Sequence, residues 1–194
     1  MNRIYKILQY LSLDVAIGSI GSSILAVKVF DVRLTAFYWL ILPVCVWIIY
    51  TSDHLLDALK VKNQATMGRH YFHYLHLKYL SVFLVLSIIF SIILIFQHLD
   101  RKTIIYGLIL CYLIISYLLL NHFISEIFRF FPREFVIAIG YIAGTWGIPI
   151  LLKYPFITMS QILILISYFL IILSIPLLYS ICEYKSDLVN GFIS

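Results

Sequence analysis

YLSVFLVLSIIFSIILIF, residues 79–96, is a long apolar stretch that contains no charged residue. A membrane-crossing helix needs roughly 20 predominantly apolar residues. The whole chain has this character, because 63% of its 194 residues are hydrophobic and 12% are charged, with a mean hydropathy of +1.02. A soluble domain is typically about 25% charged. The chain therefore has too little polar surface for a water-soluble fold, and lipid is its predicted solvent.

The apolar runs predict an all-α, polytopic membrane helix bundle with about six transmembrane helices, forming a single domain over residues 1–194. The predicted helices are 9–29, 34–52, 76–97, 103–122, 134–152 and 159–181. Polar loops that carry acidic residues are expected at 53–75 and 182–194. The basic N-terminus precedes an apolar run without a convincing small-residue cleavage site, so we interpret that run as a first membrane helix and not as a removed signal peptide.

Basic residues are distributed unequally between the two ends of the predicted bundle. Six crossings place both termini on one side, and that side carries nine of the fourteen Lys and Arg residues. Cytoplasmic loops are enriched in Lys and Arg. Both termini are therefore predicted to be cytoplasmic, in the inner membrane of a bacterium. The net charge of +5 follows this membrane pattern and does not indicate nucleic-acid binding.

Asp53 and Asp57 stand where the second predicted helix ends, in YTSDHLLDALK at residues 50–60. On a continuing helix, residues four apart lie on one face, about one turn from each other. Neighbouring carboxylates suit Mg²⁺, which often binds through one or two carboxylates together with substrate phosphates. The pair is a candidate metal site, and two solvated acids at a helix end are the alternative.

A second pair with the same spacing, Glu183 and Asp187, follows the last predicted helix on the same side. In a bundle, the two pairs can face each other across a cavity and hold Mg²⁺ ions that bridge a diphosphate. A frayed polar tail is the alternative explanation. The candidate diphosphate-binding cations are Lys60, Arg69 and Lys185, for which ordinary positive charge beside a membrane helix is the alternative.

Three further features have both a structural and a functional interpretation. Asp14 lies within the first apolar run, and a carboxylate in lipid usually faces a bundle interior or a cavity. His70, His73 and His76 recur every three residues among aromatic side chains, and we interpret them as residues of the membrane boundary in preference to zinc ligands. The glycines of GYIAGTWGIP, residues 140–149, are expected to permit close helix packing.

The order of helices and acidic motifs resembles that of the UbiA superfamily of intramembrane prenyltransferases. The first acidic motif of that family reads approximately NDxxDxxxD. IYTSDHLLD, residues 49–57, matches its last two acids with Asp53 and Asp57. Ile49 and Tyr50 stand in place of the leading Asn-Asp pair.

The second family motif is roughly DxxDxxxD followed by a glycine. YSICEYKSDLVNG, residues 179–191, supplies Glu183, Asp187 and Gly191, with Ser180 where the first acid would stand. The resemblance follows the helix order through most of the chain, although the matching residues are few. The family bundle has nine helices, and about six are predicted here.

The resemblance implies a function and a set of ligands. Mg²⁺ held by the catalytic, metal-binding residues Asp53, Asp57, Glu183 and Asp187 would bind a prenyl diphosphate. The prenyl group would then pass to a lipophilic or aromatic acceptor within the membrane lipid. We expect such a prenyltransferase, or a shortened, truncated or inactive relative of one.

Two other functions remain open. The alternative is a non-catalytic membrane subunit or lipid-binding scaffold, in which a membrane-protein partner or a second copy closes the bundle. A small transporter has only Asp14 in its favour.

Overall fold

The structure is a computed structural model that describes the chain except residues 1–2, 62–67, 124–132 and 191–194. The side chains of 3–6, 60–61, 68–70, 121–123, 133, 179–180 and 182–190 also lie outside the described set. The described residues form eight α-helices and no strand: α1 (Arg3–Tyr10), α2 (Leu13–Phe30), α3 (Ala36–Val61), α4 (Gly68–Leu75), α5 (Leu77–His98), α6 (Arg101–Phe123), α7 (Arg133–Lys153) and α8 (Met159–Asn190).

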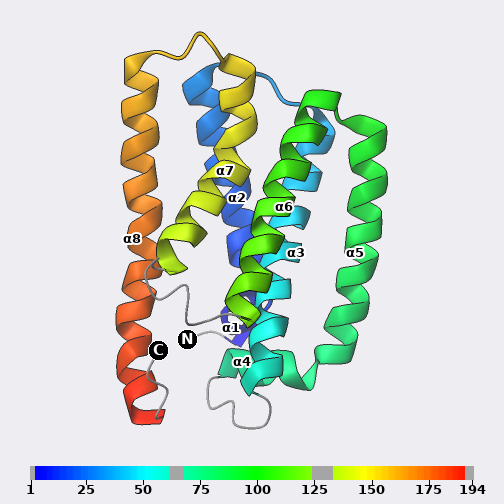
Figure 1. Ribbon diagram of the computed structural model, residues 1–194, viewed down its shortest axis with the longest axis vertical. Helices are drawn as coiled ribbons and strands as arrows, with labels where there is room; N and C mark the ends of the chain where they lie inside the picture. The colour runs from blue at the N-terminus through cyan, green and yellow to red at the C-terminus, as the bar shows by residue number, and fades with distance from the viewer. Residues whose placement is uncertain (1–2, 62–67, 124–132, 191–194) are drawn as a thin grey trace.

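Six of these helices, α2, α3, α5, α6, α7 and α8, are long and apolar enough to cross a membrane. The predicted all-α membrane bundle is thereby confirmed for the described residues, and the chain is an integral membrane protein. The long helices run alternately up and down (Figure 1). We call the end at which α2 begins and α8 finishes the lower end, which also carries α1 and α4, and the opposite end the upper end.

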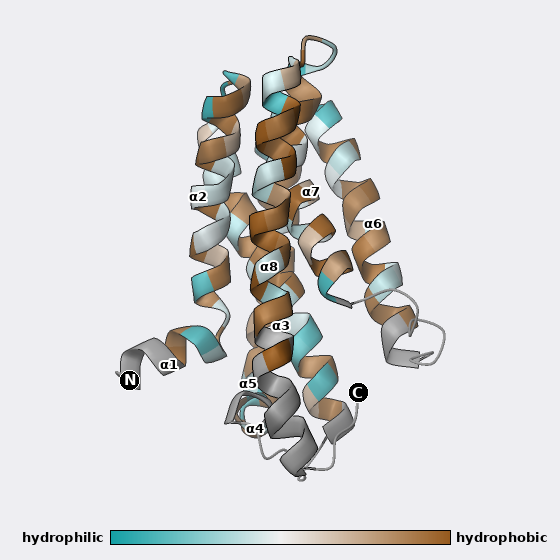
Figure 2. Ribbon diagram, turned by 90° about the vertical axis from the view of Figure 1, so that its left-hand side faces the viewer, coloured by the Kyte–Doolittle hydropathy of each residue, from teal (hydrophilic) through white to brown (hydrophobic). Residues whose placement is uncertain are grey.

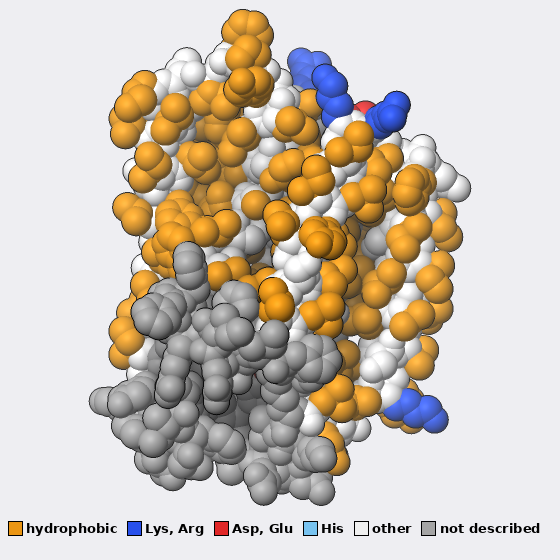
Figure 3. Space-filling model, in the orientation of Figure 1, with side chains coloured by type: hydrophobic (Ala, Val, Ile, Leu, Met, Phe, Trp, Pro, Cys, Tyr) orange, Lys and Arg blue, Asp and Glu red, His pale blue; other side chains and the backbone are white. Residues whose placement is uncertain are grey.

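The buried core lies where α2, α3 and α7 pack together. One cluster joins Tyr38 and Leu42 of α3 to Ile148 of α7, and a second joins Phe30 of α2 to Trp146 of α7. α5 packs mainly on α3, while α6 and α8 pack mainly on α7. The outer surfaces of α5, α6 and α8 are lined with exposed apolar side chains. Figure 3 shows hydrophobic side chains over the middle of one face and Lys and Arg at its upper rim and one lower corner, as expected for a bundle in lipid.

The first predicted helix, 9–29, corresponds to α2 (Leu13–Phe30), and only its residues 9 and 10 fall in the separate short helix α1. Ser12 takes a left-handed conformation (φ 55°, ψ 24°), which ends α1 and redirects the chain into α2. This backbone region is uncommon for residues other than glycine. α1 consequently projects sideways from the lower end of the bundle (Figure 2). The apolar composition of the run gave no indication of this break.

Both expected acidic loops contain helix. α3 continues through Val61, α4 occupies part of 53–75, and α8 continues to Asn190. The loops predicted at 53–75 and 182–194 are therefore corrected for the described residues. The backbone hydrogen bonds of a helix do not depend on side-chain polarity, and Leu, Ala and Lys in the first segment favour helix, so these helices extend beyond their apolar spans.

Local hydrogen bonds fix two helix starts at the upper end. The Asp100 carboxylate accepts hydrogen bonds from the backbone N–H and the hydroxyl of Thr103, at 3.1 and 2.6 Å, and so caps α6. At the start of α8, Gln161 accepts from the Thr158 N–H at 2.9 Å, and its own N–H donates to the Thr158 hydroxyl at 3.4 Å, which is the capping-box arrangement. The Gln161 amide also donates to the carbonyl oxygen of Val29 at 2.8 Å, which ties α8 to the end of α2.

Candidate functional site

Asp53 and Asp57 both lie on the continuous helix α3. Because they are four residues apart on one helix, they lie on the same face. Residues four apart on a helix have Cβ atoms about 5–6 Å apart. Both side chains are partly buried. The pair stands in the last part of α3, toward the lower end of the bundle (Figure 1). The structure therefore places two carboxylates together near the end of the apolar span of α3, which runs from Ala36 to Leu59.

Tyr50 lies one turn before Asp53 on α3. Its hydroxyl interacts electrostatically with the carboxylates of both Asp53 and Asp14. Asp14 belongs to the first turn of α2, and its side chain is exposed. The polar region beside Asp53 therefore extends to a second helix. Sequence spacing did not join Asp14 to this pair, because thirty-nine residues separate the two acids along the chain.

A hydrogen bond between helices supports this region. The indole Nε1 of Trp47 on α3 donates to the carbonyl oxygen of Leu11 at 2.9 Å. Leu11 directly precedes the left-handed Ser12, at the start of the same α2 segment that carries Asp14. The bond holds the redirected chain against α3, one turn from Tyr50.

α4 covers the lower part of α3 through buried histidines. The rings of His54 on α3 and His73 on α4 meet edge to face, with centroids 5.3 Å apart, and both side chains are buried. Beside them, Phe72 packs against Tyr10 of α1 at 5.7 Å. His76 is exposed and lies after α4. His73 packs inside the protein against His54, and the interpretation of these histidines as residues of the membrane boundary stays a prediction.

The second acidic pair lies on the C-terminal part of α8. Glu183, Lys185 and Asp187 are helical, and their side chains are outside the described residues. The same holds for the side chains of Lys60 on α3 and Arg69 on α4. The last turns of α8 and of α3 lie at the same end of the bundle (Figure 1). α8 packs mainly on α7, with a smaller contact to α2.

A buried polar network lies deeper in the bundle. The Ser22 hydroxyl of α2 donates to the Thr145 hydroxyl of α7 at 3.0 Å and accepts from the indole nitrogen of Trp146 at 3.2 Å. The Tyr141 hydroxyl stands 3.6 Å from the position of a Cβ on Gly18, and it interacts electrostatically with Tyr50. The hydrogen bonds of Ser22 therefore join α2 to Thr145 and Trp146 of α7.

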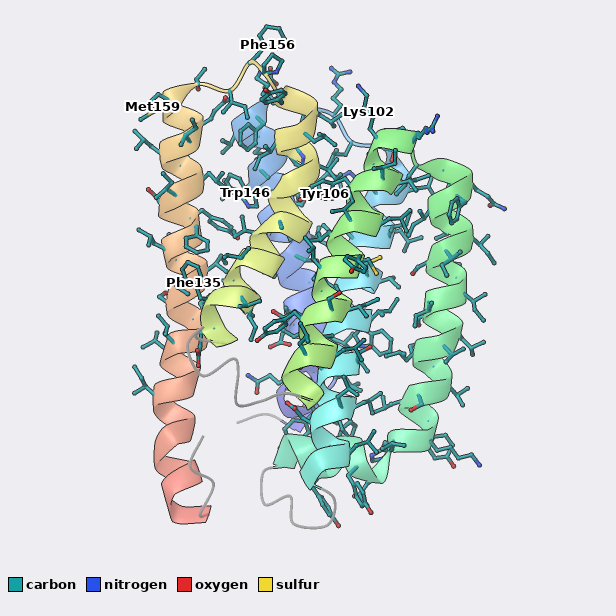
Figure 4. All side chains as sticks on the ribbon, viewed as in Figure 1. Lys102, Tyr106, Phe135, Trp146, Phe156 and Met159 are labelled. Carbon is teal, nitrogen blue, oxygen red and sulfur yellow. The ribbon has the colours of Figure 1, made fainter. Side chains whose placement is uncertain are left out.

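The expectation of close packing around the 140–149 glycines is confirmed at one position. A Cβ on Gly147 would overlap the Tyr106 side chain of α6, whose hydroxyl donates to the carbonyl oxygen of Ala143 at 2.8 Å. Gly140 and Gly144 have open space around them. Figure 4 shows Tyr106 beside α7, and Trp146 on the side of α7 that faces α8. Trp146 stacks there on Tyr168 with ring centroids 4.9 Å apart.

Within the described part of the chain, no three His, Cys, Asp or Glu side chains form a group able to hold a metal ion. Two of the four predicted metal ligands, Glu183 and Asp187, have side chains that lie outside the described residues. Comparisons with protein-family models, curated proteins and solved structures find no match for this chain.

Proposed function

We propose that the chain is a Mg²⁺-dependent intramembrane prenyltransferase of the UbiA kind, which binds a prenyl diphosphate at the lower end of its bundle. One observation carries this proposal. Asp53 and Asp57 lie one turn apart on a single helix, and α8 brings its own acidic segment to the same end. The helix order and the two acidic segments, each of which lacks part of the family motif, resemble those of the UbiA superfamily.

The donor chemistry at this end fits Mg²⁺. The ion prefers hard oxygen ligands and keeps positions for substrate phosphates, and Asp53 and Asp57 are carboxylates held on one partly buried helix face. Glu183 and Asp187 would complete the set. When bound, the ion supplies positive charge that stabilises the departing pyrophosphate. Lys60, Arg69 and Lys185 would add cationic contacts to the diphosphate oxygens.

The reaction requires one bond to break and one to form. The C–O bond between the allylic carbon and the diphosphate breaks, and pyrophosphate leaves with the electron pair. The acceptor then bonds to the allylic carbon and gives up a proton. Tyr50 lies near Asp53 and Asp14, and aromatic faces stabilise positive charge. The prenyl tail and a lipophilic or aromatic acceptor would remain in apolar surroundings.

The proposed orientation places the lower end in the cytoplasm, in the inner membrane of a bacterium. Its support is the excess of Lys and Arg assigned to that end by the six crossings. The polar diphosphate group of the substrate would then reach Asp53 and Asp57 from the cytoplasm, while the prenyl tail of the same molecule would lie along the apolar helices.

The test is equilibrium binding of geranylgeranyl diphosphate to the purified full-length chain in lipid nanodiscs, with Mg²⁺ or with EDTA. We expect Mg²⁺-dependent binding that Asp53→Asn or Asp57→Asn weakens by about tenfold or more. Asp100→Asn is the matched control, because this acid caps α6 at the upper end and asparagine also serves as a helix cap. Equal binding in EDTA, or binding unchanged in both variants, would overturn the proposal and favour a non-catalytic subunit or lipid-binding scaffold.

A further inference from the structure

The connections between helices at the upper end of the bundle differ in charge. The α2–α3 connection contains Asp31 and Arg33, and the α5–α6 connection contains Asp100. The α7–α8 connection, residues 154–158, reads YPFIT and contains no charged residue. Charged side chains are mostly exposed to water. Their absence from the α7–α8 connection therefore distinguishes it from its two neighbours.

This uncharged connection displays large apolar side chains. Phe156 is the most exposed large apolar side chain of the described residues, at 77%, and Tyr154 and Met159 are exposed by 73% and 68%. Figure 4 shows Phe156 at the top of the loop, directed away from the bundle, and hydrophobic side chains form the highest point of the face in Figure 3. We call Tyr154, Phe156 and Met159 the upper apolar tip.

Neighbouring contacts hold the backbone of the upper apolar tip in place. Ile157 is partly buried against the cluster that contains Trp146. The Phe156 N–H donates to the carbonyl oxygen of Lys153 at 2.9 Å, and the hydrogen bond of Gln161 to the end of α2 fixes the start of α8. The loop is therefore tied to the bundle through its inner residues, while the tip remains on its outer side.

The height of the tip along the bundle shows what surrounds it. The apolar span of α7 ends at Lys153 and that of α8 begins at Met159. The residues between them extend by at most about 3.6 Å each and must also cross the roughly 8–10 Å between packed helices, so the loop rises no more than about 10 Å above the two spans. The headgroup region on each side of a bilayer is roughly 5–8 Å thick. A loop this short therefore stays within that region or at its edge.

We infer that the upper apolar tip is a lipid anchor, which lies among the headgroups and outermost acyl carbons of the bilayer leaflet at the upper end. Aromatic residues collect at this boundary, where the ring of Tyr154 meets apolar carbon and its hydroxyl meets water. Lys28, in the last turn of α2, is exposed at the same end, and its ammonium group is complementary to lipid phosphates. The anchor fixes the height and tilt of α7 and α8 in the membrane, and it does not depend on the proposed function.

The test measures the depth of a nitroxide spin label in the full-length chain, in phosphatidylcholine and phosphatidylglycerol nanodiscs, with the three native cysteines replaced by alanine. The label is attached to Phe156→Cys or to Met159→Cys. Electron paramagnetic resonance compares its collision rates with oxygen, which concentrates in lipid, and with a nickel chelate, which stays in water. We expect the oxygen-to-nickel ratio at both positions to be several-fold higher than at Lys102→Cys, the control, which is exposed at the same end beside a charged connection.

Gel filtration and thermal unfolding establish that each labelled variant is folded, and either labelled position of the tip is sufficient for the test. Ratios at Phe156→Cys and Met159→Cys equal to that at Lys102→Cys would place the tip in water and overturn the inference. Low collision rates with both reagents would show that the tip is packed against protein, in an interface with a second copy or another chain, and would overturn it as well.

Discussion

The indole nitrogen of Trp47 donates a 2.9 Å hydrogen bond to the carbonyl oxygen of Leu11, across the interface between α3 and the chain that leads into α2. The carbonyl groups of the last turn of a helix have no partner within that helix, and Leu11 follows directly after α1. The bond therefore satisfies an acceptor at the break between α1 and α2. It also holds the start of α2 beside the acidic part of α3.

Replacing Trp47 by phenylalanine should loosen this junction. The variant keeps an aromatic ring beside Phe83, whose ring centroid lies 5.3 Å from that of Trp47, but it removes the donor to Leu11. We expect a loss of about 1 kcal/mol in the free energy of unfolding and faster hydrogen exchange over residues 7–16. Trp39→Phe, a second α3 tryptophan that packs on Tyr38, is the control. Equal exchange over 7–16 in the wild type and the Trp47 variant would show that the bond does not fix the junction.

Gly147→Ala should destabilise the α6–α7 contact, because the added Cβ would overlap the Tyr106 ring. Overpacking of a close contact typically costs about 1–3 kcal/mol. Gly144→Ala, less than one turn away on α7, meets open space and should be neutral or slightly stabilising, since alanine favours helix over glycine. Thermal unfolding of both variants in one detergent measures the difference. A Gly147 variant as stable as the Gly144 variant would contradict the close approach of Tyr106.

Asp100 should make the stability of the upper end depend on pH. Hydrogen bonds from Thr103 lower the pKa of its carboxyl group in the folded chain. The folded pKa lies below the unfolded one, so the charged cap stabilises the fold fully above the ordinary aspartate pKa of about 3.9. That stabilisation is lost as pH falls through the folded pKa.

The corresponding variant is Asp100→Ala, which should cost about 1 kcal/mol at neutral pH through loss of the cap. Its difference from wild type should shrink as the pH falls below about 4. Asp100→Asn, which keeps a capping oxygen, should lose less at neutral pH. A difference between wild type and Asp100→Ala that is constant from neutral to acid pH would show that the charge of the carboxylate does not contribute.

Much of the fold was predictable because the lipid solvent demands long apolar runs, and these runs mark six helices directly. Apolar length, however, locates only the part of a helix that lies in lipid. The continuation of α3 to Val61 and of α8 to Asn190 depends on backbone hydrogen bonds that also form in water. The left-handed break at Ser12 lies within an apolar run, so composition could not reveal it.

The candidate site was predictable where its residues share one helix. The spacing of Asp53 and Asp57 requires only that α3 continue, which it does. The proximity of Asp14 to Tyr50 depends on how α2 and α3 pack, and one sequence does not give that alignment. The burial of His73 against His54 likewise depends on α4 folding back onto α3. Tertiary packing, and not local spacing, decides these contacts.

The central claim is that the acids of α3 and α8 bind one cation, and a double-mutant cycle tests it most directly. The measurement is the Mg²⁺ concentration that half-saturates geranylgeranyl diphosphate binding, for wild type, Asp53→Asn, Asp187→Asn and the double variant. Ligands of one site are coupled by about 0.5–3 kcal/mol, so each single variant should weaken binding and the double variant should be weakened by less than the product of the two effects. Wild-type binding by Asp187→Asn, or two effects that simply multiply, would contradict a shared site.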